Sequence, residues 1–411
     1  MVTATGDLLL ANGLVVDPEA GITADAQNIL VRDGRVAEIG AGMSATGVER
    51  IDLGGRFVLP GLIDAHVHVT AATADLGAMT RWSPTYVTAH ASRILRGMLA
   101  RGFTTVRDVG GADYGLAAAV EDGLFAGPRI VFGGRALSQT GGHGDNRGRG
   151  EDQPPACHSP DLCQVCDGVT EVRRTARDEL RRGAAHIKIM LSGGVASPTD
   201  RVDSTGFSIE EITAIVEEAG AANRYVTGHA YTAEAINRGL RCGVRCIEHG
   251  NLLDESSVAL FRERDAFYVP TLATYAALAK EGPAAGLPEV SHRKVFDVLD
   301  AGLHALELAH RAGVNIAYGT DLLGDMHVNQ LSEFTLRGEV QSPAEILRAA
   351  TSTAARLLNM EGIIGTLALG AHADMVVVEE NPLEDIDVLS HLDQRLQLLC
   401  QGGAIVENRL N

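Results

Sequence analysis

The sequence is poor in cysteine, in aromatic residues and in positive charge. It has 6 cysteines among 411 residues, too few for a disulfide scaffold, so we expect reduced thiols. Aromatic residues make up 4% of the chain, and 35 Lys and Arg against 53 Asp and Glu leave a formal net charge of −18. Because no run of basic residues offsets this charge, we expect no nucleic acid partner.

The chain also lacks a long apolar run near its start. No basic residue precedes the apolar stretch of MVTATGDLLLANGLVVDPEAG, and Asn12 and Gly13 interrupt it well short of the length that spans a membrane. We therefore expect a cytoplasmic protein with no membrane partner. Hydrophobic residues make up 45% of the sequence, which is sufficient for a large folded core.

Both ends of the chain predict short antiparallel strands. Apolar or alternating runs separated by Gly, Asp and Asn turns occupy residues 7–16, 28–32 and 35–39, and the same pattern returns at 365–370, 374–379 and 396–407. We predict that residues 1–58 and 362–411 pair into one small β-sandwich domain.

Residues 59–361 show a different pattern, in which short buried strands alternate with helices. This alternation is typical of parallel βαβ units, and eight strands match a closed (β/α)8 barrel of the TIM type. Capping boxes begin two of the helices, at Ser208 and Ser342. The eight predicted strands are 62–68, 103–108, 129–133, 186–191, 225–229, 245–249, 267–271 and 315–320.

Residues that can bind metals lie at the ends of five of these strands. His66 and His68 end the first strand, and because strand side chains alternate, both imidazoles face the barrel mouth. Each residue alone has an ordinary structural explanation, such as a core histidine or a helix cap, but five strand ends together predict a metal site. The other residues of the set are Lys188, His229, His249 and Asp321.

Seven segments carry a resemblance to a known family. The sequence resembles the amidohydrolase superfamily, in the imidazolonepropionase-like branch that contains Xaa-Pro dipeptidases and related metallocarboxypeptidases. The segments are PGLIDAHVH (60–68), GFTTVRDVGG (102–111), LSQTGGHGD (137–145), HIKIMLSGGVASPTD (186–200), HAYT (229–232), IEHGNL (247–252) and GTDLLG (319–324).

This resemblance implies two divalent metal ions bridged by an N-carboxylated Lys188. His66, His68 and Asp321 would hold the first ion, and His229 and His249 the second. An ammonium group cannot ligate a cation, whereas a lysine carbamate is an anionic oxygen donor that can bridge two ions. Imidazole and carboxylate ligands suit zinc, and manganese or cobalt would also fit.

The implied activity is hydrolysis of an amide bond by an activated bridging water. Asp321 would take the proton of that water and deliver it to the leaving nitrogen. His143 and Tyr231 match family positions that contact the scissile carbonyl or a substrate carboxylate. We expect small N-acyl amino acids as substrates, foremost Xaa-Pro-type dipeptides.

Other substrates remain open within the same chemistry. They are N-acyl aromatic amino acids such as ochratoxin-like mycotoxins, arylureas and cyclic amides. A metal-free scaffold protein is a further alternative, but such proteins lose ligands, whereas all six expected ligand positions are filled here. A homo-oligomer is compatible with the sequence.

The segment 138–168 is too long to be a neutral connection, so we expect it to contribute to substrate binding. It offers Arg147 and Arg149 as carboxylate donors, unless both are merely solvated. A structural zinc site at its cysteines would need four ligands in suitable geometry, and only one CxxC motif is present. We therefore expect free thiols at Cys157, Cys163 and Cys166, with His158 beside them, and core positions for Cys242, Cys246 and Cys400.

Overall fold

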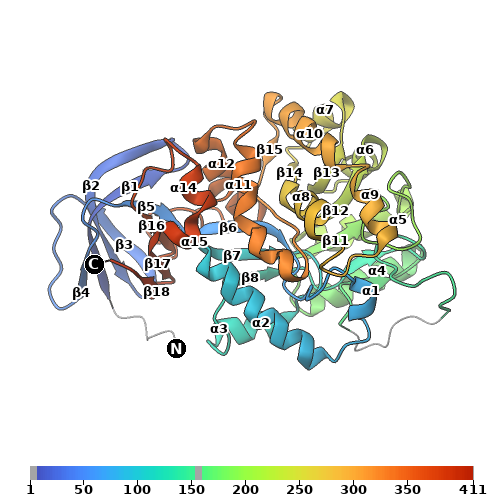
Figure 1. Cartoon of the computed structure of the whole chain (residues 1–411), viewed down its shortest axis with the longest axis horizontal. Helices are drawn as coiled ribbons and strands as arrows, with labels where there is room; N and C mark the ends of the chain where they lie inside the picture. The colour runs from blue at the N-terminus through green and yellow to red at the C-terminus, as the bar shows by residue number, and fades with distance from the viewer. Residues whose placement is uncertain (1–6, 153–159, 411) are drawn as a thin grey trace.

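The computed structural model describes residues 7–152 and 160–410. A β-sheet built from both ends of the chain lies beside a larger α/β body, which contains the middle of the sequence (Figure 1). The split into domains at residues 58/59 and 361/362 stays a prediction. No helix in the described residues is long and apolar enough to cross a membrane.

The strands of the two chain ends form one eight-stranded sheet. Strand β5 joins them, because it pairs parallel to β1 and antiparallel to β16. This edge-to-edge pairing does not show the two-sheet sandwich that the sequence predicts. The strands are β1 (Leu8–Asp17), β2 (Ile22–Arg32), β3 (Arg35–Gly40), β4 (Glu49–Asp52), β5 (Phe57–Pro60), β16 (Met375–Val378), β17 (Leu396–Gln401) and β18 (Ala404–Asn408).

Both faces of this sheet are buried at β16. Met375 and Val377 belong to a core shared with β1, β2 and β17, whereas Val376 and Val378 belong to a core shared with helices of the α/β body. Alternation along one strand therefore fastens the sheet to the body that carries the site.

All eight strands predicted for the middle of the chain are present and parallel. They lie in two sheets, one of β6, β7 and β8, and one that runs from β10 through β9 and β11 to β15. Two additional strands, β9 (Ala136–Ser138) and β10 (Cys163–Val165), flank the long segment. The predicted eight are β6 (Leu62–Val67), β7 (Phe103–Asp108), β8 (Arg129–Phe132), β11 (His186–Met190), β12 (Tyr225–Thr232), β13 (Cys246–Leu252), β14 (Phe267–Val269) and β15 (Asn315–Ile316).

Backbone hydrogen bonds outside the regular strand pairing join the two sheets on both sides. Ala65 N donates to Tyr318 O at 2.8 Å, and Ala185 N donates to Phe132 O at 2.8 Å. Regular strand pairing is interrupted between β8 and β9 and between β15 and β6, so the two sheets do not form one closed barrel. Gly134, with a φ of 72°, separates β8 from β9.

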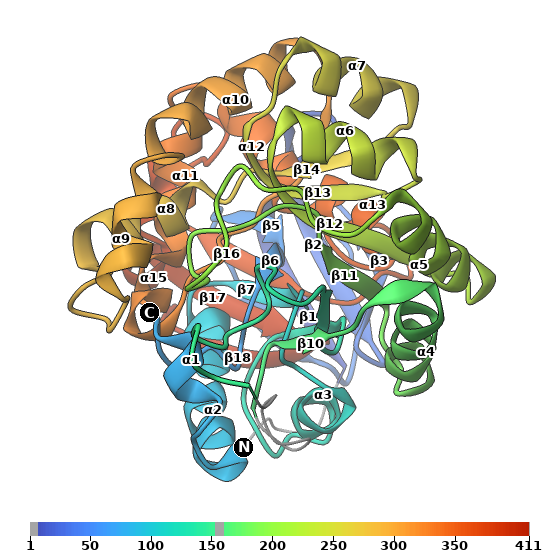
Figure 2. The same ribbon diagram turned by 90° about the vertical axis from the view of Figure 1, so that its right-hand side faces the viewer.

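Helices lie around the parallel strands of the α/β body (Figure 2). The capping box predicted at Ser208 is confirmed, since Glu211 N donates to Ser208 Oγ and Ser208 N donates to Glu211. The box at Ser342 is also confirmed. The helices are α1 (Leu76–Met79), α2 (Pro84–Ala100), α3 (Tyr114–Glu121), α4 (Gly168–Arg181), α5 (Ile209–Ala221), α6 (Ala233–Arg241), α7 (Glu255–Glu263), α8 (Leu272–Glu281), α9 (Glu289–Val295), α10 (Leu299–Arg311), η1 (Gly324–Leu331), α11 (Ser332–Arg337), α12 (Pro343–Ala349), α13 (Ser352–Leu357), α14 (Asp387–Ser390) and α15 (Leu392–Arg395).

Candidate metal centre

The first part of the site lies where β6 ends and where the chain continues beyond β15. Asp321 N donates to His66 O at 2.8 Å, which holds the two segments together. Asp321 Oδ1 consequently lies 3.3 Å from His66 Nε2 and 3.3 Å from His68 Nε2. Burial would raise the pKa of Asp321, but the neighbouring imidazoles hold it well below the usual value, so this carboxylate is ionised.

His249 on β13 completes a compact group of donor atoms. One ligand atom each from His66, His249 and Asp321 lies within 4.8 Å of the others, and together they could hold a metal ion. His249 reaches this position through a left-handed backbone with a φ of 70°. Such strain persists only where the surrounding structure enforces it, and it concentrates at functional sites.

His229 and His143 extend the row of imidazoles. The ring centroid of His229 lies 4.6 Å from that of His249, and His143 stacks on His229 at 4.2 Å. Burial lowers the pKa of His229 and His249 well below the usual value, which favours the neutral form that binds metals. His229 Nε2 donates to Gly193 O at 3.1 Å, which leaves Nδ1 with the free lone pair.

Lys188 on β11 is 2% exposed. Among residues 7–152 and 160–410, no carboxylate lies within ion-pairing distance of its Nζ atom. Burial lowers the pKa of Lys188, although the charges of Glu248 and Asp321 oppose this effect. The structure thus buries an amine with a reduced tendency to carry a proton.

The structure brings the predicted histidine and aspartate ligands close together. The resemblance implies that His249 and His229 share one ion. In the structure, His249 is adjacent to His229 and also lies with His66 and Asp321. His68 contacts the same carboxylate from the other side. The division of these residues between two ions stays a prediction.

The sequence reasoning missed Glu248, a fully buried acid beside the ligands. Its Oε2 lies 2.6 Å from His66 Nδ1, and Arg107 Nη2 donates to its Oε1 at 2.8 Å. Burial opposes the charge of Glu248, but Arg107 and His66 hold its pKa well below the usual value. The sequence did contain a signal for Glu248, which lies in the buried-strand segment IEHGNL. An acidic residue in a buried strand requires a partner.

The donor atoms present fit a divalent cation. His66 Nδ1 must donate to the ionised Glu248, and His68 Nδ1 donates to Gly110 O at 2.8 Å, so in the neutral form of each ring Nε2 carries the lone pair. His66 Nε2 is buried and has no hydrogen-bond partner among the described residues. Fixing the ring through the other nitrogen is how proteins orient histidines that bind metals.

His143 is held by a second network that the sequence reasoning missed in part. Its Nδ1 lies 2.9 Å from Ser197 Oγ, and Ser197 contacts Asp200. Lys294 Nζ of α9 lies 3.2 Å from Asp200 Oδ1. Burial lowers the pKa of His143 to about 4, although Asp200 opposes this shift. The imidazole is therefore neutral near pH 7.

Tyr231 lies next to the imidazoles, with its ring 4.8 Å from His229, and it is 2% exposed.

The two arginines of the long segment differ from each other in their surroundings. Arg147 forms a two-point ion pair with Asp145, at 2.8 and 2.6 Å, so its guanidinium is already occupied. Arg149 is exposed.

The cysteines are free thiols wherever the structure describes them. Cys163 and Cys166 are buried, and burial raises the pKa of Cys166 to about 12. Cys246 and Cys400 are core residues as predicted, and the partly buried Cys242 packs against a core. Cys157 and His158 lie outside the described residues.

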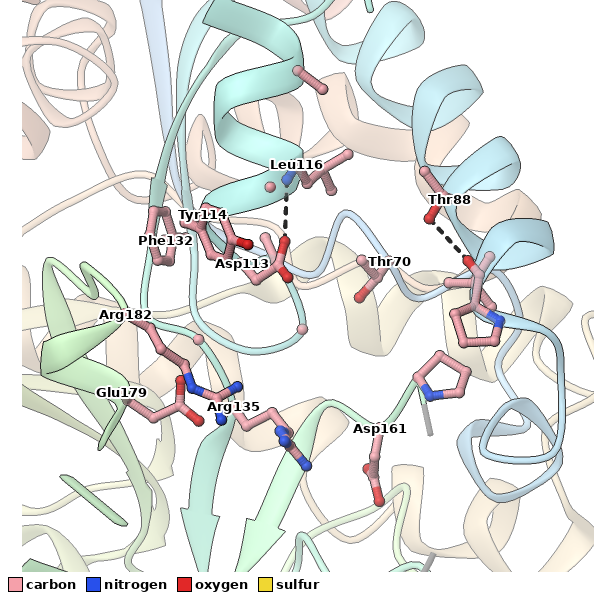
Figure 3. Close-up of a pocket in the computed structure, with 18 of the residues that line it drawn as sticks. Thr70, Thr88, Asp113, Tyr114, Leu116, Phe132, Arg135, Asp161, Glu179 and Arg182 are labelled. Carbon is pink, nitrogen blue, oxygen red and sulfur yellow. Dashed lines mark hydrogen bonds between the residues drawn. The ribbon is translucent and has the colours of Figure 1, made fainter. Parts of the chain in front are cut away.

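A separate cavity of about 490 Å³ lies between α2, α3 and the segment around Asp161 (Figure 3). Arg135, Arg182 and Glu179 line one side of it, and Thr70 is also part of its lining. None of the predicted metal ligands lines this cavity, so it is distinct from the metal centre.

Comparison with known proteins identifies the family. The Amidohydrolase family matches residues 57–405. The chain belongs to this family. Ochratoxinase of Aspergillus niger is 35% identical over 347 residues, which cover 80% of this chain and 72% of that protein.

Two solved structures of peptidases are also similar to this amidohydrolase. A prolidase crystallised with N-methylphosphonate-L-proline is 47% identical with a TM-score of 0.96, over 98% of this chain and 100% of that one. A Xaa-Pro dipeptidase with methionine in its active site is 29% identical with a TM-score of 0.88, over 98% and 100% of the two chains. The family and these neighbours imply a TIM-barrel α/β fold and a hydrolase acting on amide or peptide bonds, in a family whose members are typically metal-dependent.

Proposed function

We propose that this amidohydrolase is a binuclear metal-dependent dipeptidase that cleaves Xaa-Pro-type dipeptides. The observation that carries the metal-dependent part is the convergence of His66, His249 and Asp321 donors within 4.8 Å, in a site that buries both histidines. The 47% identical prolidase with its proline-containing phosphonate supports the substrate class.

His66, His68 and Asp321 would hold one ion, and His229 and His249 the other, with carboxylated Lys188 shared between them. The burial of Lys188 supports carboxylation, because only the unprotonated amine can attack carbon dioxide. The nitrogen and oxygen donors suit zinc. Bound ions would supply an activated water and polarise the scissile carbonyl.

The chain's own residues would then move the proton. Asp321 is ionised and lies at the centre of the cluster, so it can accept a proton from water and pass it to the leaving nitrogen. His143 and Tyr231 would contact the scissile carbonyl or the substrate carboxylate. Since Arg147 is occupied by Asp145, these two residues are the preferred partners for the substrate.

A second candidate substrate is an N-acyl aromatic amino acid. The 35% identity to ochratoxinase favours it. The aromatic wall formed by Tyr231 and Tyr275, whose ring centroids lie 6.0 Å apart, could also accept an aromatic group.

The test is a substrate panel assayed on purified protein loaded with zinc. It compares Ala-Pro, Met-Pro and Phe-Pro with N-acetylphenylalanine, an ochratoxin-type amide and a phenylurea. We expect the highest kcat/KM for the Xaa-Pro dipeptides and close to two metal ions per chain. An Asp321→Asn preparation made in parallel controls for contaminating peptidases. Turnover of the aromatic amides alone would reject the dipeptidase proposal in favour of the second candidate.

A further inference from the structure

We propose that Tyr275 and Thr271 are positioning residues: Tyr275 aims the Tyr231 hydroxyl at the substrate, and Thr271 fixes the imidazole of His249. The inference rests on the proposed function for the role of Tyr231. The two contacts themselves depend only on the geometry described below.

The first contact joins two tyrosines. The Tyr275 hydroxyl of α8 donates to the Tyr231 hydroxyl of β12 at 3.0 Å. Both side chains are 2% exposed. Burial raises the pKa of Tyr231 above its usual value, while donation from Tyr275 opposes this shift.

The second contact is between His249 and Thr271. His249 Nδ1 lies 2.8 Å from Oγ1 of Thr271, which is fully buried and immediately precedes α8. When Nδ1 carries the proton of the neutral imidazole, it donates to Thr271 Oγ1.

The two contacts leave the functional atoms free. Because Tyr275 donates to the Tyr231 oxygen, the Tyr231 proton can be donated to a substrate oxygen. With Nδ1 held by Thr271, His249 Nε2 would keep its lone pair for a metal ion.

The backbone indicates that these contacts are enforced. His249 has a φ of 70° and Thr271 a φ of 49°. A left-handed conformation is a marked outlier for a β-branched residue such as threonine. The strained pair brings Nδ1 and Oγ1 together, which is the arrangement expected where strain serves a site.

The first test replaces Tyr275 by phenylalanine and uses Tyr268→Phe as the matched control. Tyr268 of β14 is also fully buried, but its hydroxyl has no hydrogen-bond partner in the part of the chain that the structure describes. We expect Tyr275→Phe to lower kcat/KM for an Xaa-Pro dipeptide by about 10- to 100-fold, with Tyr268→Phe within about twofold of the parent. Both should bind the parent amount of zinc. Equal activity of the two variants would overturn the proposal.

A double-mutant cycle separates positioning from general damage. If Tyr275 acts through Tyr231, adding Tyr275→Phe to Tyr231→Phe should cost no further activity. Losses that simply add would overturn the role of Tyr275 as a positioning residue. Thermal unfolding of each variant measures any structural loss separately.

The Thr271 link is tested without any assay of activity. Thr271→Val keeps the branched side chain and removes the hydroxyl, whereas Thr271→Ser keeps the hydroxyl. In competition with a chelator, we expect Thr271→Val to bind zinc about 10- to 100-fold more weakly and Thr271→Ser to remain close to the parent. Parent affinity in the valine variant would overturn the link to His249. If the parent protein cleaves no dipeptide, the proposed function fails while this measurement still decides the Thr271 contact.

Discussion

Replacing Glu248 with glutamine should weaken metal binding because Glu248 holds His66. The same replacement at a buried glutamate away from the metal ligands should leave metal binding unchanged. Glu248 accepts a hydrogen bond from His66 Nδ1 with one oxygen and a hydrogen bond from Arg107 with the other. A glutamine side chain has one oxygen and one amide nitrogen. If the nitrogen faces Arg107, two donors meet; if it faces His66, the imidazole must change tautomer and lose the lone pair on Nε2.

The magnitude follows from the burial of the ion pair. Glu248 and Arg107 are both fully buried, and removing one partner of such a pair costs about 3–5 kcal/mol of folding stability. The glutamine keeps one acceptor, so we expect a loss near the lower end of that range. Losing the partner that orients a metal-binding histidine typically costs about 10- to 100-fold in metal affinity.

The control is Glu333→Gln. Glu333 and Arg337 form another fully buried ion pair, with Arg337 Nε 2.8 Å from Glu333 Oε1, and neither residue contacts a predicted metal ligand. Urea unfolding should show a comparable loss of stability in both variants. Chelator competition under folded conditions should show a loss of zinc affinity in Glu248→Gln alone. Equal zinc affinity in the two variants would refute the positioning of His66 by Glu248.

Three further predictions concern the proposed chemistry. Lys188→Ala should lose most of the bound metal and activity, with partial rescue by added short carboxylates, and a variant with parent metal content and rate would contradict the bridging role. Asp321→Asn should keep the parent circular dichroism spectrum yet lower kcat by about 10²- to 10⁴-fold, and a rate within about tenfold of the parent would remove the general base. Amidating the carboxylate of a dipeptide substrate should lower kcat/KM by about 30- to 5000-fold, and equal values would argue for a neutral amide substrate.

The sequence predicts the strands of the α/β body and the ligand-bearing strand ends because these depend on local patterns. Period-two alternation places His66 and His68 on one side of β6, and the structure brings both to Asp321. No local pattern in the sequence shows which strand joins the two chain ends. Strand β5 could pair with strands of either end, and it pairs with both β1 and β16.

Features that depend on backbone conformation or on distant partners were not predicted. A regular strand would carry Glu248 and His249 to opposite faces, and the left-handed φ of His249 is what brings both toward His66. The sequence offers Arg147 as a donor for a substrate carboxylate, but Asp145, two residues earlier, already binds its guanidinium. Neither feature can be inferred from the period of the hydrophobic pattern.

Hydrogen bonds to Asp64 offset the backbone strain at the site. Asp321 adopts a φ of 53°, and a residue held in this region costs about 1–3 kcal/mol. The preceding Thr320 is fixed by Asp64, whose carboxylate accepts from Thr320 Oγ1 at 2.6 Å and from Thr320 N at 3.2 Å. Asp64 also accepts from His66 N at 3.1 Å, so one buried carboxylate sets both segments that carry these ligands. The donors are therefore brought together by hydrogen bonds of the polypeptide itself, which lowers the ordering cost that a metal ion must overcome when it binds.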